Sequence, residues 1–117
     1  MDTAYTAAGL PFAQALTVLA TVVSVTPPAG EVPGWAVADV GLKALGMDHG
    51  NPTVPGGRVW FCSDEHLTFA PDEPLAVGDR VHVLPAHVDP TVALHEHMHL
   101  VRGDEVLDVW PVDLRGW

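Results

Sequence analysis

Short runs of β-branched residues, each closed by glycine or proline, recur along the whole chain and constrain its fold most strongly. The clearest run covers residues 16–25 (LTVLATVVSV) and stops at residues 27–30 (PPAG). Valine and threonine favour strands, whereas proline cannot donate to a strand ladder and glycine suits tight turns. We therefore interpret residues 16–25 as a strand that ends in a turn. It belongs to a longer apolar stretch, residues 10–25, that we expect to be buried.

Six further segments show the same strand pattern. They are residues 35–40, 58–62, 67–70, 75–84 (with a turn at Gly78 and Asp79), 91–102 and 105–112. A tight hairpin is predicted at Gly103 and Asp104, and residues 42–45 have room for one helical turn. Seven short strands with little helix indicate a small barrel or sandwich. We predict an all-β, barrel-like single domain over residues 1–117, with at most one or two short helical turns.

The charge balance argues against two classes of partner. Fifteen acidic residues face five basic ones, which gives a net charge of −10, and the cations are scattered singly. Nucleic acids and anionic membranes bind clustered Lys and Arg, so neither is expected. The single cysteine, Cys62, makes no internal disulfide, which fits a reducing, cytoplasmic setting. The stretch 10–25 falls short of the roughly 20 residues that span a bilayer, and no Lys or Arg precedes it as in a signal peptide.

A candidate metal pair lies in residues 84–90 (LPAHVDP). Proline favours an extended conformation for the residue before it, so we expect an extended segment through Asp89. His87 and Asp89 would then project to the same side, roughly 7 Å apart at Cα, and converge on one cation. Two protein ligands leave positions open for water or substrate, as a catalytic metal needs. The alternative is a loop whose Asp and His face water.

A second cluster contains His95, His97 and His99, which share one face of the predicted strand 91–102. The opposite face carries Val92, Leu94, Met98 and Leu100. Three imidazoles at this spacing span some 13 Å, so they cannot all meet one ion without a bend. Adjacent members could chelate a transition metal at the surface, but we interpret the cluster as a polar, solvated face.

A third cluster, residues 63–66 (SDEH), lies at a strand junction. Asp64 and His66 are candidates for proton transfer, but the same residue types equally cap a turn, and both interpretations stay open. Lys43 is the only lysine and hence the only possible Schiff-base nucleophile. It is also placed for a local ion pair with Asp39.

Seven short motifs follow one another along the chain, and their order carries a resemblance to a known family. They are residues 1–5 (MDTAY), 19–24 (LATVVS), 38–45 (ADVGLKAL), 63–66 (SDEH), 77–81 (VGDRV), 85–92 (PAHVDPTV) and 109–112 (VWPV), followed by Arg115 and Gly116. Together they resemble the C-terminal domain of the D-threonine aldolase and D-serine dehydratase family, which are pyridoxal-phosphate enzymes built on the alanine-racemase plan. The resemblance covers nearly the whole chain.

This resemblance implies a metal-binding domain that works with an N-terminal α/β barrel. In the family the barrel supplies the pyridoxal-phosphate lysine, so Lys43 is not expected to be that lysine, and we expect the chain alone to be inactive. The family's H-x-D or H-x-C residues bind a divalent metal, which makes His87 and Asp89 the expected ligands. Dehydratase-like members carry Cys at the second position. Asp89, a hard oxygen ligand, favours Mn²⁺ or Mg²⁺ over Zn²⁺ and favours the aldolase.

The activity that the resemblance implies is retro-aldol cleavage of a D-3-hydroxy amino acid to glycine and an aldehyde. The metal would stabilise the alkoxide forming at the 3-hydroxyl while pyridoxal phosphate takes up the carbanion electrons. A D-serine dehydratase or racemase of the same architecture is one alternative, and a non-catalytic β module for binding or dimerisation is another. The full enzyme is expected to be a homodimer. The four Trp and the apolar N-terminal stretch predict an exposed apolar patch where the barrel docks.

Overall fold

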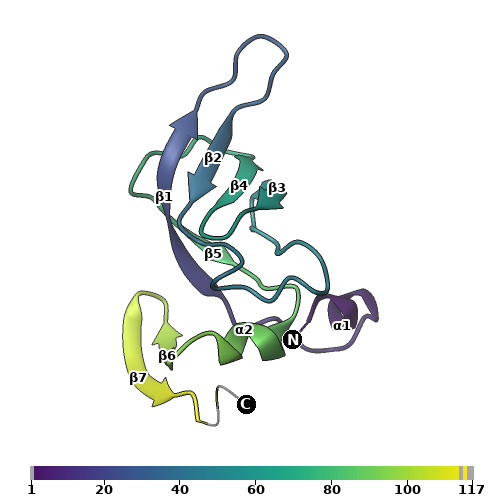
Figure 1. Cartoon of the computed structure of the whole chain (residues 1–117), viewed down its shortest axis with the longest axis vertical. Coiled ribbons are helices and arrows are strands. Elements are labelled where there is room, and N and C mark those ends of the chain that lie inside the picture. The colour runs from purple at the N-terminus through teal and green to yellow at the C-terminus, as the bar shows by residue number, and fades with distance from the viewer. Residues whose placement is uncertain (1, 114, 116–117) are drawn as a thin grey trace.

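The computed structural model of this protein describes residues 2–113 and residue 115. Over these residues the chain forms seven strands and two short helices, which confirms the predicted all-β class (Figure 1). In chain order the elements are α1 (Thr3–Ala7), β1 (Val18–Thr26), β2 (Trp35–Ala38), β3 (Gly57–Cys62), β4 (Leu67–Pro71), β5 (Arg80–Val83), α2 (Val88–Ala93), β6 (His97–Arg102) and β7 (Glu105–Pro111). No helix in the described part of the chain is long and apolar enough to cross a membrane.

Five antiparallel strands form one sheet in the order β3-β4-β2-β1-β5, curled into a half-barrel. The curl centres on β1, which pairs with β5 over residues 18–21 and with β2 over residues 22–26. The register between β1 and β2 shifts between Val22 and Ser24, and such a bulge bends a strand and increases its twist. One long strand therefore links the edge strand β5 to the rest of the sheet, and the predicted barrel-like shape is confirmed.

The core fills the inside of this curl. In β2, Ala36 and Ala38 are buried and alternate with more exposed residues, as the two-residue period of a strand requires. They pack with buried residues of the neighbouring strands and of the turn after β2: Val22, Leu45, Leu67, Phe69 and Val83. The segments that leave the sheet after β5 and after β2 therefore start from the buried core, through Val83 and Leu45.

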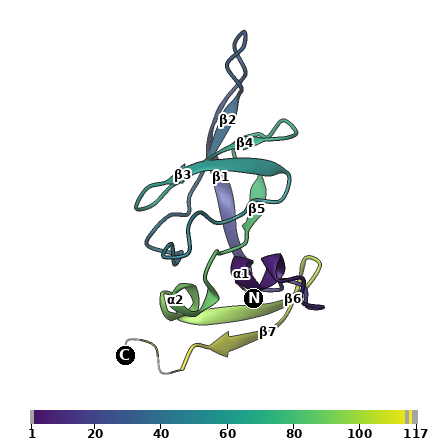
Figure 2. The ribbon, with the colours of Figure 1, turned by 90° about the vertical axis from the view of Figure 1, so that its right-hand side faces the viewer.

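Both helices and the C-terminal hairpin gather at one end of the molecule, whereas the β1–β2 connection reaches out at the other end (Figures 1 and 2). The N-terminal segment is tied to the start of α2, because Thr3 N donates to Ala86 O at 3.2 Å. The loop that follows β2 also reaches this region, where Gly46 and His87 form a β-bridge. Three distant parts of the sequence therefore meet just before α2.

Strands β6 and β7 form a two-stranded sheet of their own. Gly103 has a φ of 58°, as a tight hairpin turn requires, so the predicted turn is confirmed. The hairpin exposes large apolar side chains: Leu100, Val101, Val106, Leu107, Val109 and Trp110. An isolated two-stranded hairpin is marginally stable in water. This surface agrees with the expected apolar patch, and its docking to a barrel stays a prediction.

Two predicted strands begin later than expected. The apolar stretch 10–25 is buried only in part: β1 starts at Val18, while Leu10 and Phe12 are 43% and 68% exposed. Pro11 between them has no N–H to donate to a ladder, and α1 occupies the residues before them. The other late strand is β6, which was predicted over residues 91–102. It starts at His97 because residues 91–93 belong to α2.

Candidate functional site

His87 is the residue immediately before α2, with extended backbone angles (φ −131°, ψ 121°). The helix begins at Val88, so the expected extended segment through Asp89 is wrong. Pro90 is the third helical residue, and N–H groups in the first turn have no intrahelical acceptor, so proline there removes no hydrogen bond. Asp89 therefore lies in the first turn of α2, where its exposed carboxylate suits the positive end of the helix.

The start of α2 is fixed by groups from elsewhere in the chain. Val88 N donates to Asp2 Oδ1 at 2.7 Å, so the Asp2 carboxylate caps the helix. Buried Thr91 donates through Oγ1 to His87 O at 2.7 Å and accepts from Gly46 N at 2.9 Å. A Cβ at Gly46 would lie 2.4 Å from the ring of Pro90, so only glycine lets these segments approach. The backbone of His87 is consequently held from both sides.

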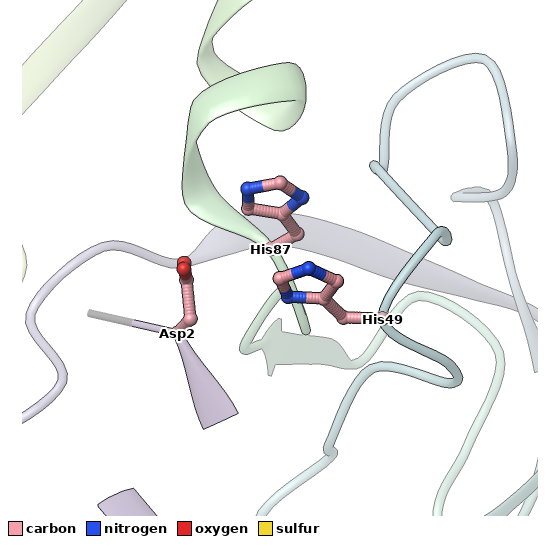
Figure 3. A group of neighbouring side chains, drawn as sticks. All are labelled: Asp2, His49 and His87. Atoms are coloured by element: carbon pink, nitrogen blue, oxygen red, sulfur yellow. The ribbon is translucent and has the colours of Figure 1, made fainter. Parts of the chain in front are cut away.

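Asp2, His49 and His87 form a group that could hold a metal ion, because one potential ligand atom of each lies within 4.8 Å of the others. Figure 3 shows the three side chains meeting from the N-terminal segment, the loop after β2 and the start of α2. Sequence reasoning found His87 but missed its two neighbours. Asp2 belongs to the first of the seven motifs that carry the family resemblance, but no spacing rule relates residues 2, 49 and 87.

The expected second ligand is outside this group. Within the described residues, the three-member group contains neither Asp89 nor the candidate proton-transfer residues Asp64 and His66. The pairing of His87 with Asp89 stays a prediction, now from the first turn of a helix and not from an extended segment.

The two imidazole rings are stacked, with centroids 3.9 Å apart and planes within 1° of parallel. A histidine binds a metal through a lone pair that lies in the plane of its ring. An ion in the plane of His87 therefore lies off the plane of His49. In this arrangement His49 covers the face of His87, and it must rotate its ring before it can share an ion with His87.

Asp48 determines which nitrogen of His87 is available. Its Oδ2 accepts a hydrogen bond from His87 Nδ1 at 2.7 Å and lies 3.9 Å from His49 Nε2. The hydrogen bond from His87 holds the pKa of the Asp48 carboxyl below its usual value. Since Nδ1 is engaged, His87 presents Nε2 to a ligand. An imidazole nitrogen and the Asp2 carboxylate are donors that fit a divalent cation.

The corner at residues 63–66 is a closed turn between β3 and β4. Ser63 N donates to His66 O at 2.8 Å, and Leu42 N donates to Ser63 O at 3.0 Å. Gly41 permits this approach, because a Cβ there would lie 2.2 Å from Ser63 O. The backbone of this corner thus agrees with the interpretation of residues 63–66 as a turn.

The side chains of the same corner border an open depression of about 400 Å³ lined by Lys43, Ser63, Asp64, Glu65 and His66. The structure therefore brings the two candidate proton-transfer residues to one surface. Their catalytic role stays a prediction.

The expected ion pair between Asp39 and Lys43 is wrong. Asp39 Oδ1 accepts from Thr21 N at 2.6 Å, so this carboxylate is bound to the neighbouring strand. Lys43 pairs instead with Glu65, at 2.5 Å between Nζ and Oε1. The hydrogen bond with Glu65 raises the pKa of the exposed Lys43 ammonium. Lys43 is therefore engaged in an ion pair at the surface.

The histidine cluster near the C-terminus divides into two parts. His95 precedes β6 and its Nε2 donates to Ala44 O at 2.9 Å. His97 and His99 lie exposed on β6, as the predicted solvated face requires. None of the three belongs to a metal-competent group of three or more ligands among the described residues.

Residues 15–101, which run from β1 to β6, match the family model described as "Putative serine dehydratase domain". The chain belongs to this family. The match includes the sheet, the loop after β2 and α2, and hence His49 and His87.

Three similar proteins differ in how much of their own length this chain covers. The 3-hydroxy-D-aspartate aldolase of Paracoccus denitrificans is 42% identical over 88 residues, which cover 72% of this chain and 23% of that protein. The crystal structure of D-threonine aldolase from Filomicrobium marinum superposes with a TM-score of 0.83 and 34% identity over 99% of this chain and 33% of that one. This chain thus spans a quarter to a third of the two aldolases. An uncharacterised Mycobacterium bovis protein is 35% identical over 113 residues, 87% of this chain and 84% of that protein.

Proposed function

We propose that this chain is the metal-bearing domain of an aldolase that cleaves D-3-hydroxy amino acids to glycine and an aldehyde. The observation that carries the proposal is the meeting of His87 and Asp2 at one end of a fold that matches D-threonine aldolase over 99% of the chain. Imidazole and carboxylate donors that converge from separate segments are typical of a metal site. The 42% identity to an aldolase of a hydroxylated D-amino acid supports the same reaction class.

The residues that would hold the ion are His87 through Nε2, Asp2 through its second oxygen, and Asp89 from the first turn of α2. A divalent ion held there would act as a Lewis acid on the 3-hydroxyl oxygen of the substrate. Hard carboxylates with one imidazole suit Mn²⁺, with Mg²⁺ and Zn²⁺ as competitors. His87 lies at the surface with a fifth of its side chain exposed, so a substrate can reach the ion.

The remaining chemistry is divided between this chain and its partner. His66 and Asp64 are the candidate groups that accept and return the hydroxyl proton, since both border the same open depression. Pyridoxal phosphate, bound by an α/β barrel, would supply the electron sink for the bond that breaks at Cα. Lys43 holds its proton against Glu65 and takes no part in that linkage. The chain alone is therefore expected to be inactive, and the apolar β6–β7 hairpin is the surface that we expect the barrel to cover.

A second candidate is dehydration, which the family description itself favours. The same ion at the 3-hydroxyl would assist its departure, so the metal ligands serve either reaction. The products separate the two reactions: an aldolase gives glycine and an aldehyde, and a dehydratase gives ammonia and a keto acid.

The test is product analysis of the chain together with a pyridoxal-phosphate barrel of its family, with Mn²⁺ and either D-threonine or 3-hydroxy-D-aspartate. We expect glycine and aldehyde in equal amounts without ammonia. His87→Ala should lower turnover by at least about 100-fold while the pyridoxal-phosphate absorbance stays intact.

His82→Ala is the matched control, because His82 is an exposed histidine of β5 that belongs neither to the proposed site nor to the hairpin, and this variant should keep full activity. Ammonia and keto acid as the products would assign the dehydratase instead. No turnover of either kind, with cofactor and metal both bound, would leave a non-catalytic binding module.

A further inference from the structure

Among the described residues, one hydrogen-bonded neighbour of the His87 side chain can fix its tautomer, namely Asp48. Asp48 Oδ2 lies 2.7 Å from His87 Nδ1, a short, charge-assisted distance. A carboxylate can only accept at this contact, so Nδ1 carries the proton and the lone pair is left on Nε2. Metal-ligating histidines commonly donate their other nitrogen to a carboxylate in this way, which fixes both ring orientation and tautomer.

The loop that carries Asp48 is held against the segment of His87 independently of this contact. Gly50 N donates to Met47 O at 3.0 Å, which closes a turn around Asp48. Gly46, two residues before Asp48, forms a β-bridge with His87, and its N–H donates a hydrogen bond to Oγ1 of buried Thr91. The distance between carboxylate and imidazole is therefore set by the fold and not by a chance meeting of two mobile side chains.

The rest of the surroundings is consistent with a carboxylate that serves His87. Asp48 is 58% exposed, whereas the His87 side chain is 20% exposed, so the carboxylate reaches inward from the surface to the ring. The ring of His49, the next residue along, stacks on His87 and restricts rotation of its plane. The edge and the face of His87 are thus both held by neighbouring residues of one loop.

We infer that Asp48 is a positioning residue that holds His87 in the Nδ1–H tautomer, with Nε2 directed to a divalent metal. The role of the metal rests on the proposed function, whereas the tautomer is a property of the metal-free chain. Asp48 itself is not a metal ligand in this assignment.

The experiment measures the His87 tautomer by long-range ¹H–¹⁵N NMR on the metal-free chain at pH 8, and Mn²⁺ affinity by calorimetry on the same samples. Asp48→Ala removes the acceptor, Asp48→Asn keeps an acceptor oxygen without the charge, and Asp72→Ala removes an exposed carboxylate just after β4 as the charge-matched control. We expect the wild type and Asp72→Ala to show His87 protonated at Nδ1. Asp48→Ala should shift the proton to Nε2 and weaken Mn²⁺ binding roughly 10–100-fold, with Asp48→Asn intermediate in both readouts.

An unchanged His87 tautomer in Asp48→Ala, with Mn²⁺ affinity within about twofold of wild type, would overturn the inference, because loss of the hydrogen-bond partner of a metal-binding histidine normally weakens metal affinity by more than that. Equal weakening in Asp72→Ala would also overturn it, since net charge alone would then explain the loss. If the wild type binds no Mn²⁺ while the tautomer shifts as expected, the metal proposal fails and the positioning of His87 by Asp48 stands.

Discussion

At the scale of single residues, His49 decides how many ligands the candidate site contains. Its ligand atom is close enough to His87 and Asp2 for a shared ion, but its ring is parallel to His87 and directs its lone pairs elsewhere. The orientation of the rings outweighs their proximity, because coordination follows the lone pair and not the ring centre. We therefore assign His49 a packing role on the face of His87, and not a role as a metal ligand.

Replacement of His49 by Phe tests this assignment. Phe keeps an aromatic face against His87 but offers no ligand atom, so Mn²⁺ affinity should stay within about threefold of wild type. His49→Ala removes the stacked ring as well and should weaken binding by roughly tenfold, as loss of a supporting neighbour does. Calorimetric titration checks both variants. A loss in His49→Phe as large as that in His49→Ala would make the nitrogen, and hence ligation, the important property.

The sequence predicted this site only in part, for reasons that lie in single residues. His87 was identified because H-x-D is a local pattern. Asp2 and His49 were missed because their approach to His87 depends on the fold of residues far apart in the chain. The Asp39–Lys43 pair was wrong because Thr21 of the neighbouring strand competes for the carboxylate, which local spacing does not reveal.

At the scale of elements, α2 is a six-residue helix whose stability depends on contacts with neighbouring segments. Isolated helices this short are unstable in water, so tertiary contacts must supply the stability. Asp2 caps its first N–H, and Thr91 links its first turn to both His87 and Gly46. The pattern of residues 91–102 alternates as a strand does, and these contacts override that pattern at its beginning.

Thr91→Val tests how much this buried hydroxyl contributes. Valine has nearly the same shape but leaves Gly46 N and His87 O without their partner, which should cost about 1–3 kcal/mol in the free energy of unfolding. Urea denaturation with an unchanged m-value measures it. Thr53→Val, at an exposed position in the loop after β2, is the control and should change stability by less than about 0.5 kcal/mol. Equal stabilities of the two variants would show that Thr91 does not hold α2 in place.

The strands were predicted far better than the helices. All seven strand segments were identified because β-branched runs between glycine and proline are local signals, and the hairpin at Gly103 followed from its turn residues. The order β3-β4-β2-β1-β5 could not be predicted, because it depends on which strands pair across long sequence separations. α1 also lay beyond prediction, since five residues give too short a pattern.

At the scale of the whole molecule, the curled sheet serves as a platform and the candidate site lies at one of its ends. The N-terminal segment, the loop after β2 and the start of α2 meet there, close to the separate hairpin in the ribbon (Figures 1 and 2). The hairpin exposes apolar side chains on a two-stranded sheet that packs little against the rest. The candidate site and the exposed apolar surface therefore lie toward the same end of the molecule.

The proposed function requires that His87 hold a divalent metal, and Mn²⁺ binding by the chain itself is the sharpest measurement of that role. Electron paramagnetic resonance of free Mn²⁺ counts bound ions without any need for turnover. We predict one Mn²⁺ per chain, with affinity reduced at least about 30-fold in His87→Ala and unchanged when His97 and His99 are both replaced by Ala. Wild-type affinity in His87→Ala, or loss of binding in the double hairpin variant, would refute metal binding by His87 and assign the metal to other residues.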